Sequence, residues 1–306
     1  MFTEKFKIAA GYTLISLIWG STWLAIRFGL GSLTPFISAG LRFFLASLFV
    51  YGMMRIKNIS LQKDILSIKL YAVLSLFSFV IPFGLVYWAE QYIPFGLASI
   101  VFGVMPFFVI IYSIIAFKKD SVTFNQIFGS ILGFSGIVII FSENLSLDLS
   151  QQLLGILAVL ISSSMQAGIG VTIKKYGQHL NPLSMNFLPL LSAGIILIIV
   201  SILVENSSAW IFDFNAFASI TFLAFFGTLV TFTTYYWLLK RMNIVILSLT
   251  AFITPIIAVI LGWLILNENF SFQTLAGSAL VLIGILFANF RGLMNYYLTK
   301  RKLQNG

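Results

Sequence analysis

The chain has 306 residues, of which 59% are hydrophobic and 9% are charged, and its mean hydropathy is +1.03. These figures are typical of a polytopic membrane protein and leave loops too short for a separate soluble domain. The absence of cysteine excludes disulfides, thiolate metal sites and cysteine nucleophiles. The net charge of +9 does not indicate nucleic-acid binding, because the basic residues follow loop order instead of forming one block.

Apolar stretches long enough to cross a bilayer run through the chain almost end to end. A transmembrane helix needs about 20 predominantly apolar residues, because lipid offers the backbone no hydrogen-bond partners. The expected fold is therefore an all-α membrane protein of ten transmembrane helices. The predicted spans are 8–28, 35–55, 68–88, 94–117, 124–141, 152–173, 184–205, 215–238, 244–266 and 272–291.

The basic residues predict which side of the membrane each loop occupies. Apart from Arg27 and Arg42, every Lys and Arg falls in every second connecting segment or in the two tails. Because Lys and Arg accumulate in cytoplasmic loops, both termini are expected in the cytoplasm. The opposite loops carry acidic residues and no Lys: Glu90, Glu143, Asp148, Glu205, Asp213 and Glu268.

The first two spans contain the groups most suited to a polar cavity. Trp19 and Thr22 give the first span an amphipathic aromatic face. Arg42 lies seven residues beyond Pro35, which is about 10 Å into the second span. Intramembrane charges usually face a bundle interior or an aqueous cavity, so Arg42 is predicted to contact a substrate carboxylate or hold a gate closed. Snorkelling towards the outer headgroups is the alternative.

The third span ends in a polar group near the outer surface. Tyr87 and Glu90 share one helical face there, which predicts an outer vestibule or gate, although a solvated helix end would have the same pattern. No Asp or Glu falls in the middle of a span. The carboxylate relay of proton-coupled carriers is therefore not predicted.

Polar stripes at helical spacing mark three spans of the second half. The pairs are Ser162 with Gln166, Thr231 with Tyr235, and Thr250 with Thr254. Such groups bind amphipathic molecules when they converge on a largely apolar pocket. The alternative for each pair is hydrogen bonding between neighbouring helices.

Prolines and glycines inside spans predict bends and close packing. Pro106 and Pro255 remove backbone donors and are assigned to hinges or gates, with simple packing kinks as the alternative. Small-residue faces are formed by Gly129, Gly133 and Gly136, and by Gly277 with Gly284. They predict close helix contacts, either within the bundle or between the protomers of a homodimer.

Parts of the sequence recur after about half its length. A shift of 149 residues places Tyr87-Trp88 on Tyr236-Trp237, Ser99 on Ser248 and Pro106 on Pro255, and nearby shifts align Gly129 with Gly277, Gly136 with Gly284 and Pro35 with Pro182. Chance similarity among apolar helices is the alternative. Repeats of five spans, 1–149 and 150–306, would enter the membrane from opposite sides, because five is odd. Inverted repeats are the architecture of alternating access.

Short motifs along the chain resemble those of a known family. Trp19-Gly20-Ser21-Thr22, Pro35 leading to Arg42, Pro106, and Leu266-Asn267-Glu268 followed by Gly277 and Gly284 are similar to the EamA-type branch of the drug/metabolite transporter superfamily. The resemblance covers essentially the whole chain. It implies a bacterial inner-membrane carrier of ten helices, often an exporter of amino acids or other small metabolites, without a bound cofactor. Lys118-Lys119-Asp120 departs from the pattern, since a Glu often follows the fourth helix of the family.

The predicted function is therefore secondary transport of a small organic molecule. The expected partners are the substrate and the lipid bilayer, with no nucleic acid, metal or cofactor. A passive channel is the nearer alternative, because a polar path between the halves could stay open. A membrane-embedded enzyme is disfavoured, because the chain has no cysteine, one loop histidine and no intramembrane carboxylate pair.

Overall fold

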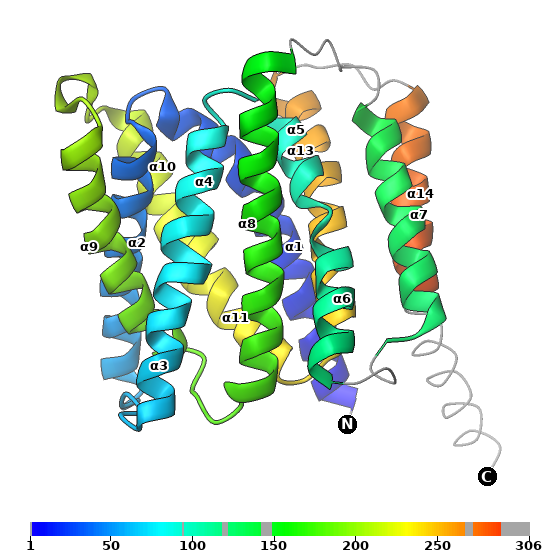
Figure 1. Cartoon of the computed structure of the whole chain (residues 1–306), viewed down its shortest axis with the longest axis horizontal. Helices are drawn as coiled ribbons and strands as arrows, with labels where there is room; N and C mark the ends of the chain where they lie inside the picture. Colours follow the sequence, from blue (N-terminus) through cyan, green and yellow to red (C-terminus); the bar gives the residue numbers. More distant parts are fainter. Residues whose placement is uncertain (1, 94, 118–121, 142–148, 267–271, 289–306) are drawn as a thin grey trace.

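The computed structural model describes residues 2–93, 95–117, 122–141, 149–266 and 272–288, and the regular structure of these residues is entirely helical. The first half contains α1 (Phe2–Leu30), α2 (Pro35–Ile56), α3 (Ile65–Leu74), α4 (Ile81–Ala89), α5 (Phe95–Phe102), α6 (Met105–Phe117) and α7 (Phe124–Phe141). The second half contains α8 (Leu149–Tyr176), α9 (Ser184–Val204), α10 (Phe214–Ala224), α11 (Thr231–Leu239), α12 (Ile244–Ser248), α13 (Thr250–Leu266) and α14 (Phe272–Ala288). The helices stand side by side in one bundle (Figure 1).

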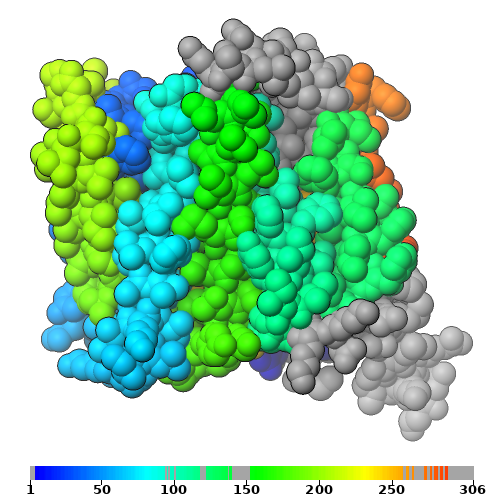
Figure 2. Space-filling model, in the orientation of Figure 1, coloured from blue at the N-terminus to red at the C-terminus, as the bar shows by residue number. Residues whose placement is uncertain are grey.

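Six of the predicted spans form helical segments that are long and apolar enough to cross a membrane. They are Glu4–Leu30, Pro35–Ile56, Ile65–Ala89, Gln152–Tyr176, Ser184–Val204 and Phe214–Leu239. Large apolar side chains are exposed on the outside of the bundle, among them residues of α3, α8 and α9, which lie on the face drawn in Figure 2. Examples are Ile68, Phe77, Leu157, Ile161 and Ile199. Such a surface suits contact with lipid tails.

The two halves contain the same series of elements. In each half the third span is a helix, a π-helical turn and a second helix: α3, Ser75–Val80 and α4 in the first half, and α10, Phe225–Val230 and α11 in the second. The second set begins 149 residues after the first, at Phe214 instead of Ile65. In Figure 1 the first set rises through the bundle and the second descends. The halves therefore run in opposite directions.

The repeat extends to the helix caps. Asp64 accepts a hydrogen bond from Ser67 N at the start of α3, and Asp213 accepts one from Ala216 N at the start of α10. These two N-cap residues are also 149 positions apart. The hydrogen bond from the Ser67 side chain is the main cause that lowers the pKa of Asp64, and the Ala216 N–H is the main cause that lowers the pKa of Asp213.

Basic and acidic residues are unevenly distributed between the two ends of the bundle. One end holds basic residues at the start of α1 and the ends of α2, α8 and α11, among them Lys5, Arg55, Lys174 and Lys240, and we call it the basic end. The other end, called the acidic end, holds Glu90, Glu205 and Asp213. The predicted loop residues Lys118, Lys119, Glu143, Asp148 and Glu268 and the basic tail after 288 lie outside the described residues.

Two predicted spans differ from continuous helices. The span 94–117 is divided into α5 and α6 at Gly103 and Val104, and the span 244–266 is divided into α12 and α13 at Leu249. In the first case Pro106 follows within one turn and supplies no backbone N–H, so the helix restarts after the break. In the second, Leu249 N turns back to Ile246 O. Apolar periodicity contains no signal for such breaks, which lie within continuous apolar runs.

The predicted glycine faces pack α7 against α14 within the chain. A Cβ atom at Gly129 would lie 2.4 Å from the carbonyl oxygen of Gly284, and one at Gly136 would lie 2.5 Å from that of Gly277. The two backbones are in contact at both levels, which only glycine allows. These glycines are therefore used inside the bundle, and they provide no argument for a homodimer.

Glu205 joins the two halves at the acidic end. Its carboxylate accepts hydrogen bonds from Phe36 N at 2.8 Å and Ile37 N at 3.1 Å, at the start of α2. It also accepts from the hydroxyls of Thr34 at 2.7 Å and Ser201 at 2.6 Å. An anion at a helix N-terminus satisfies donors that have no partner within the helix. Glu205 therefore holds α2 and α9 together.

Replacing Gly284 tests the contact between α7 and α14. Gly284→Ala puts a Cβ 2.5 Å from Gly129 O, so we expect the free energy of unfolding to fall by about 1–3 kcal/mol. The control is Gly52→Ala in α2, where a Cβ meets no atom within 4 Å. That variant should unfold at the wild-type temperature or slightly above it. Equal melting temperatures of the two purified variants would contradict the packing.

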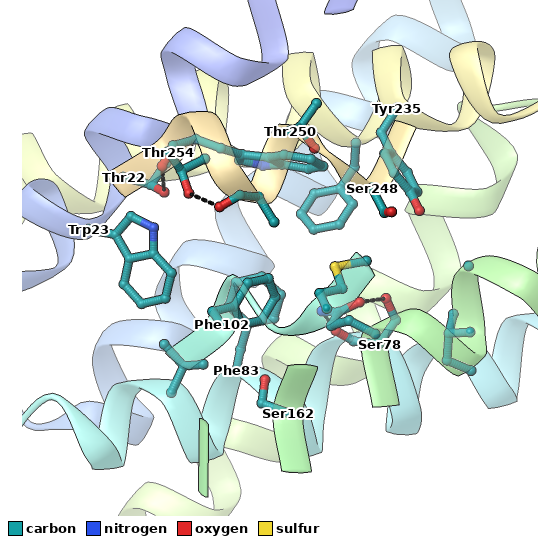
Figure 3. Close-up of a pocket in the computed structure, with 18 of the residues that line it drawn as sticks. Thr22, Trp23, Ser78, Phe83, Phe102, Ser162, Tyr235, Ser248, Thr250 and Thr254 are labelled. Carbon is teal, nitrogen blue, oxygen red and sulfur yellow. Dashed lines mark hydrogen bonds between the residues drawn. The ribbon is translucent and has the colours of Figure 1, made fainter. Parts of the chain in front are cut away.

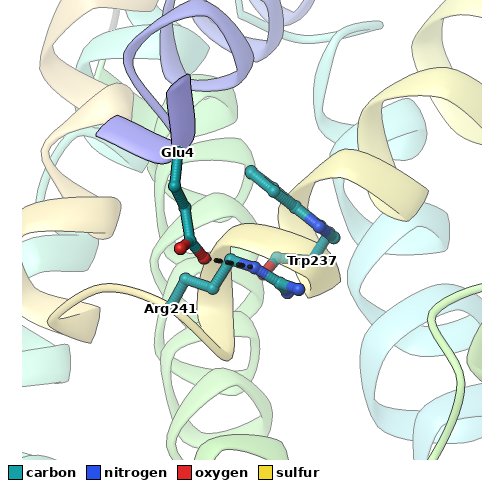
Figure 4. Close-up of polar contacts among 3 residues, drawn as sticks. All are labelled: Glu4, Trp237 and Arg241. Carbon is teal, nitrogen blue, oxygen red and sulfur yellow. Dashed lines mark hydrogen bonds and ion pairs between the residues drawn. The ribbon is translucent and has the colours of Figure 1, made fainter. Parts of the chain in front are cut away.

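Replacing Glu205 tests the connection between the halves. Glu205→Ala removes four hydrogen bonds to a charged group, and we expect a loss of about 2 kcal/mol or more in the free energy of unfolding. The control is Glu4→Ala, because Glu4 is 65% exposed and makes one ion pair, at 3.6 Å, with Arg241, which stacks on Trp237 (Figure 4). An exposed pair contributes about 0–1 kcal/mol. Thermal unfolding that affects both variants equally would argue against the Glu205 contact.

Candidate binding cavity

A cavity of about 110 Å³ lies between the two halves. It is lined by residues of α1, α2, α4, α5, α6, α8, α11, α12 and α13 and of the first π-helical turn. Its aromatic wall consists of Trp19, Trp23, Phe83, Phe102, Phe232, Tyr235 and Tyr236. Its polar groups are Thr22, Arg42, Ser78, Ser162, Gln166, Ser248, Thr250 and Thr254. Figure 3 shows Thr22, Thr250 and Thr254 on one side and Phe83 and Ser162 on the other.

Eight residues predicted for the cavity line it, although they come from five separate helices. They are Trp19, Thr22, Arg42, Ser162, Gln166, Tyr235, Thr250 and Thr254. Tyr87 and Thr231 are buried behind the wall. Of the predicted gate and hinge residues, Pro106 is the second residue of α6, Pro255 lies inside α13 and Glu90 follows α4. None of these three lines the cavity.

Arg42 is held in place by hydrogen bonds from several elements. The side chain is 1% exposed. Its Nε donates to Thr228 Oγ1 at 3.0 Å, its Nη2 to Gly227 O at 3.1 Å and its Nη1 to Tyr87 OH at 3.1 Å. The guanidinium also lies 4.9 Å from the centre of the Phe83 ring. These contacts leave Arg42 no freedom to snorkel towards the surface.

All the groups that bind Arg42 are neutral. Within the described part of the chain it forms no ion pair, and it is the one charged residue among those that line the cavity. A guanidinium has five N–H donors, and the three bonds above do not use them all. A buried cation without an anion is unfavourable by several kcal/mol. The site is therefore suited to receive an anion.

The irregular segments of the bundle meet at this cavity. Phe102 and Met105 flank the break between α5 and α6, and Ser248 and Thr250 flank the break between α12 and α13. The first π-helical turn contributes Ser78, and the second supplies both Gly227 and Thr228 to Arg42. π-helical turns and broken membrane helices expose backbone groups and often occur at functional sites. The two turns have no sequence pattern in common: Pro82 follows the first, but the second has Phe232 at the equivalent position.

Among the polar groups of the cavity, Ser162 differs from the pair formed by Gln166 and Ser78. Ser162 Oγ is buried and has no hydrogen-bond partner among the described residues. Gln166 is bound to Ser78, donating to its carbonyl oxygen at 2.8 Å and accepting from its hydroxyl at 3.1 Å. Ser162 is thus available to a ligand, whereas Gln166 fixes the π-helical turn to α8.

The acidic end of the cavity is bordered by Arg27 and Glu90. Arg27 follows Ile26, which lines the cavity, and its Nη1 donates to the backbone oxygen of Glu90 at 3.4 Å. The Arg27 side chain is exposed, whereas Glu90 is 1% exposed. The sequence allowed a solvated helix end at Glu90, but the structure buries its side chain.

At the basic end, Lys174 forms a contact equivalent to that of Arg27, with two hydrogen bonds instead of one. Lys174 lies 147 positions after Arg27, and its Nζ donates to the backbone oxygens of Leu239, the last residue of α11, and of Met242 in the turn that follows. Lys240 in turn donates to the backbone oxygens of Gln178 and Leu180 after α8. Repeat-related cations on α1 and α8 therefore cap the ends of α4 and α11.

The described residues contain no group of His, Asp or Glu side chains that could hold a metal ion. The cavity itself offers a cation at Arg42, several hydroxyls and an aromatic wall, which are groups that recognise small molecules.

Comparisons with known proteins indicate a membrane transporter. The model of the EamA-like transporter family matches the chain twice, over residues 8–142 and 153–290. The uncharacterized transporter YoaV of Bacillus subtilis is 28% identical over 93% of this chain and 97% of its own length. The uncharacterized inner membrane transporter YedA of Escherichia coli K12 is 26% identical over 85% and 83%.

A solved crystal structure shares the fold. It is 16% identical, and it superposes with a TM-score of 0.78 over 93% of this chain and 97% of that chain. The family match covers both halves and most of the chain. The protein therefore belongs to the EamA-like transporter family of the drug/metabolite transporter superfamily, and it is a multi-pass membrane transporter and not an enzyme.

Proposed function

We propose that the protein is a secondary carrier of small amphipathic molecules that bear a carboxylate, and that amino acids or related compounds are exported through it by alternating access. The observation that carries this proposal is Arg42, a buried cation at the cavity wall that lacks an anionic partner within the described residues. Guanidinium and carboxylate groups form charge-assisted hydrogen bonds, often in pairs. A carboxylate is therefore the ligand group that fits best.

The rest of the wall supports an amphipathic ligand. Trp19 contacts the rings of Phe232 and Tyr235, at centroid distances of 5.6 and 5.5 Å, and Trp23 contacts Phe102 at 5.9 Å. Such a wall accepts an apolar side chain and can also face an ammonium group. The threonine and serine hydroxyls add a few hydrogen bonds to a largely apolar pocket, which is the usual composition of a small-molecule site.

Alternating access is supported by the two ends of the cavity. At the basic end α8 and α11 are joined by Lys174 and Lys240, and at the acidic end α1 and α4 are joined by one longer bond from Arg27. Related halves that run in opposite directions can exchange these two arrangements. We assign the breaks near Pro106 and before Pro255 to the hinges.

The proposed placement in the membrane follows the charges. The basic end faces the cytoplasm, because Lys and Arg accumulate there. Both termini then lie in the cytoplasm, and the units 1–149 and 150–306 each cross the membrane five times. α7 is the fifth crossing of the first unit and α14 the fifth crossing of the second, which gives ten crossings in all.

Replacing Arg42 tests the proposed substrate site. In liposomes we expect the wild type to transport leucine but not leucinamide, which lacks the carboxylate. Arg42→Gln should raise the half-saturating leucine concentration about tenfold or more, because a hydrogen bond to a charged group contributes about 1.5–3 kcal/mol. Arg55→Gln, in the exposed last turn of the same helix, is the control and should transport normally.

Two further results separate the outcomes of this experiment. Arg42→Lys keeps the charge but not the paired donors, so it should fall between wild type and Arg42→Gln if the protein folds. Equal transport of leucine and leucinamide by the wild type would contradict the carboxylate site without any mutation. Flux that does not saturate and shows no counterflow would favour a passive channel.

Replacing Lys174 tests the closure of the basic end. The natural chain has no cysteine, so Ile169→Cys gives a single reporter on the cavity wall. In inside-out vesicles, Lys174→Met should increase its labelling by an impermeant maleimide several-fold, because two hydrogen bonds to the end of α11 are lost. Lys175→Met changes the exposed neighbour and should leave the rate unchanged. Equal rates in both variants would argue against Lys174 as a gate residue.

A further inference from the structure

The side chain of Glu90 is buried at the acidic end of the cavity without a hydrogen-bond partner. It is 1% exposed, and neither carboxylate oxygen has a partner in the described part of the chain. Its backbone N–H donates to Val86 O at 3.0 Å, so Glu90 lies one helical turn beyond a residue of the cavity wall. It also lies three residues beyond Tyr87, the hydroxyl of which binds Arg42.

The charged groups around Glu90 are two arginines. Arg27 from α1 and Arg42 from α2 both act electrostatically on its carboxyl group, and Tyr87 is the titratable neighbour on its own helix. α8 packs against α4, but its stretch from Gln152 to Gln166 has no titratable residue. The π-helical turn Ser75–Val80 has none either. The arginines are therefore the groups that can stabilise a negative charge on Glu90.

The repeat shows that this carboxyl is not needed to cap the helix. Glu90 follows the last residue of α4, and Lys240 follows the last residue of α11, 150 positions later. Lys240 uses its charge in hydrogen bonds to the backbone oxygens of Gln178 and Leu180 in the loop after α8. Glu90 makes no corresponding side-chain contact among the described residues, so its burial has no evident structural purpose.

Charge balance gives Glu90 a role. A buried carboxylate without hydrogen bonds is unfavourable unless a cation offsets its charge. Here the field of Arg42 provides part of that offset. Anything that reduces the positive charge at Arg42 therefore makes protonation of Glu90 more favourable. A substrate carboxylate bound to Arg42 has this effect.

We propose that Glu90 is a proton-binding site whose occupancy is linked to that of Arg42: the carboxylate takes up a proton from water when an anion binds Arg42, and releases it to water when the anion leaves. On uptake the O–H bond between the proton and a water oxygen is broken, and an O–H bond to a carboxyl oxygen of Glu90 is formed. No group is oxidised or reduced. The link to the substrate rests on the proposed function above. This proton uptake makes the transport of a carboxylate dependent on pH, although no carboxyl group lies in the middle of a span.

The proton site is tested on the purified protein without any substrate. Infrared titration should show the carbonyl stretch of a protonated, dehydrated carboxyl group that appears as the pH falls, and Glu90→Gln should lose this band. Arg42→Gln should retain the band with its midpoint at higher pH, because the neighbouring cation is gone. Asp213→Asn, at the same end, is the control and should keep the wild-type titration, since Asn caps a helix as well as Asp.

The outcomes separate this proposal from the proposed function. A band that persists in Glu90→Gln, or no band in the wild type at any pH, would overturn the proton site. A band that does not move in Arg42→Gln would overturn its link to Arg42. Circular dichroism of each variant shows whether it is folded. Leucine transport by the wild type tests the carrier separately, because it requires no result from the titration.

Discussion

The buried guanidinium of Arg42 is the interaction on which the site depends. Two of its three hydrogen bonds go to Gly227 and Thr228 in the π-helical turn of the second half, and the third goes to Tyr87 of the first half. A cation in this position stays buried only if its donors are used, and neutral groups use them in part. The same side chain thus joins the halves, and in the proposed function it provides the anion site between them.

The architecture places irregular backbone around this cation. Both broken helices and both π-helical turns contact the cavity or Arg42, whereas the regular helices α7, α9 and α14 contribute none of the lining residues and pack through glycines. Regular helices satisfy their own backbone, so the polar groups available to a ligand are concentrated where regularity fails. The halves share one plan but differ in charge: Arg27 and Glu90 at one end correspond to Lys174 and Lys240 at the other.

The sequence predicted much of this arrangement. Span length predicted the all-helical fold and its six long apolar helices, and the depth of Arg42 predicted a buried cation that lines a cavity. Polar spacing identified Ser162, Gln166, Thr250 and Thr254, because helical periodicity is visible in a single chain. It could not identify Ser78, Gly227 or Thr228, since π-helical turns have no pattern in an apolar run. Nor could it predict the burial of Glu90, which depends on tertiary packing around the end of α4.

The measurement that tests the central claim most directly is a structure of the protein with a transported carboxylate bound. The account predicts carboxylate oxygens at about 2.7–2.9 Å from the Arg42 guanidinium, within the aromatic wall between the halves. A ligand bound with its carboxylate elsewhere, while Arg42 keeps only Tyr87, Gly227 and Thr228 as partners, would contradict it.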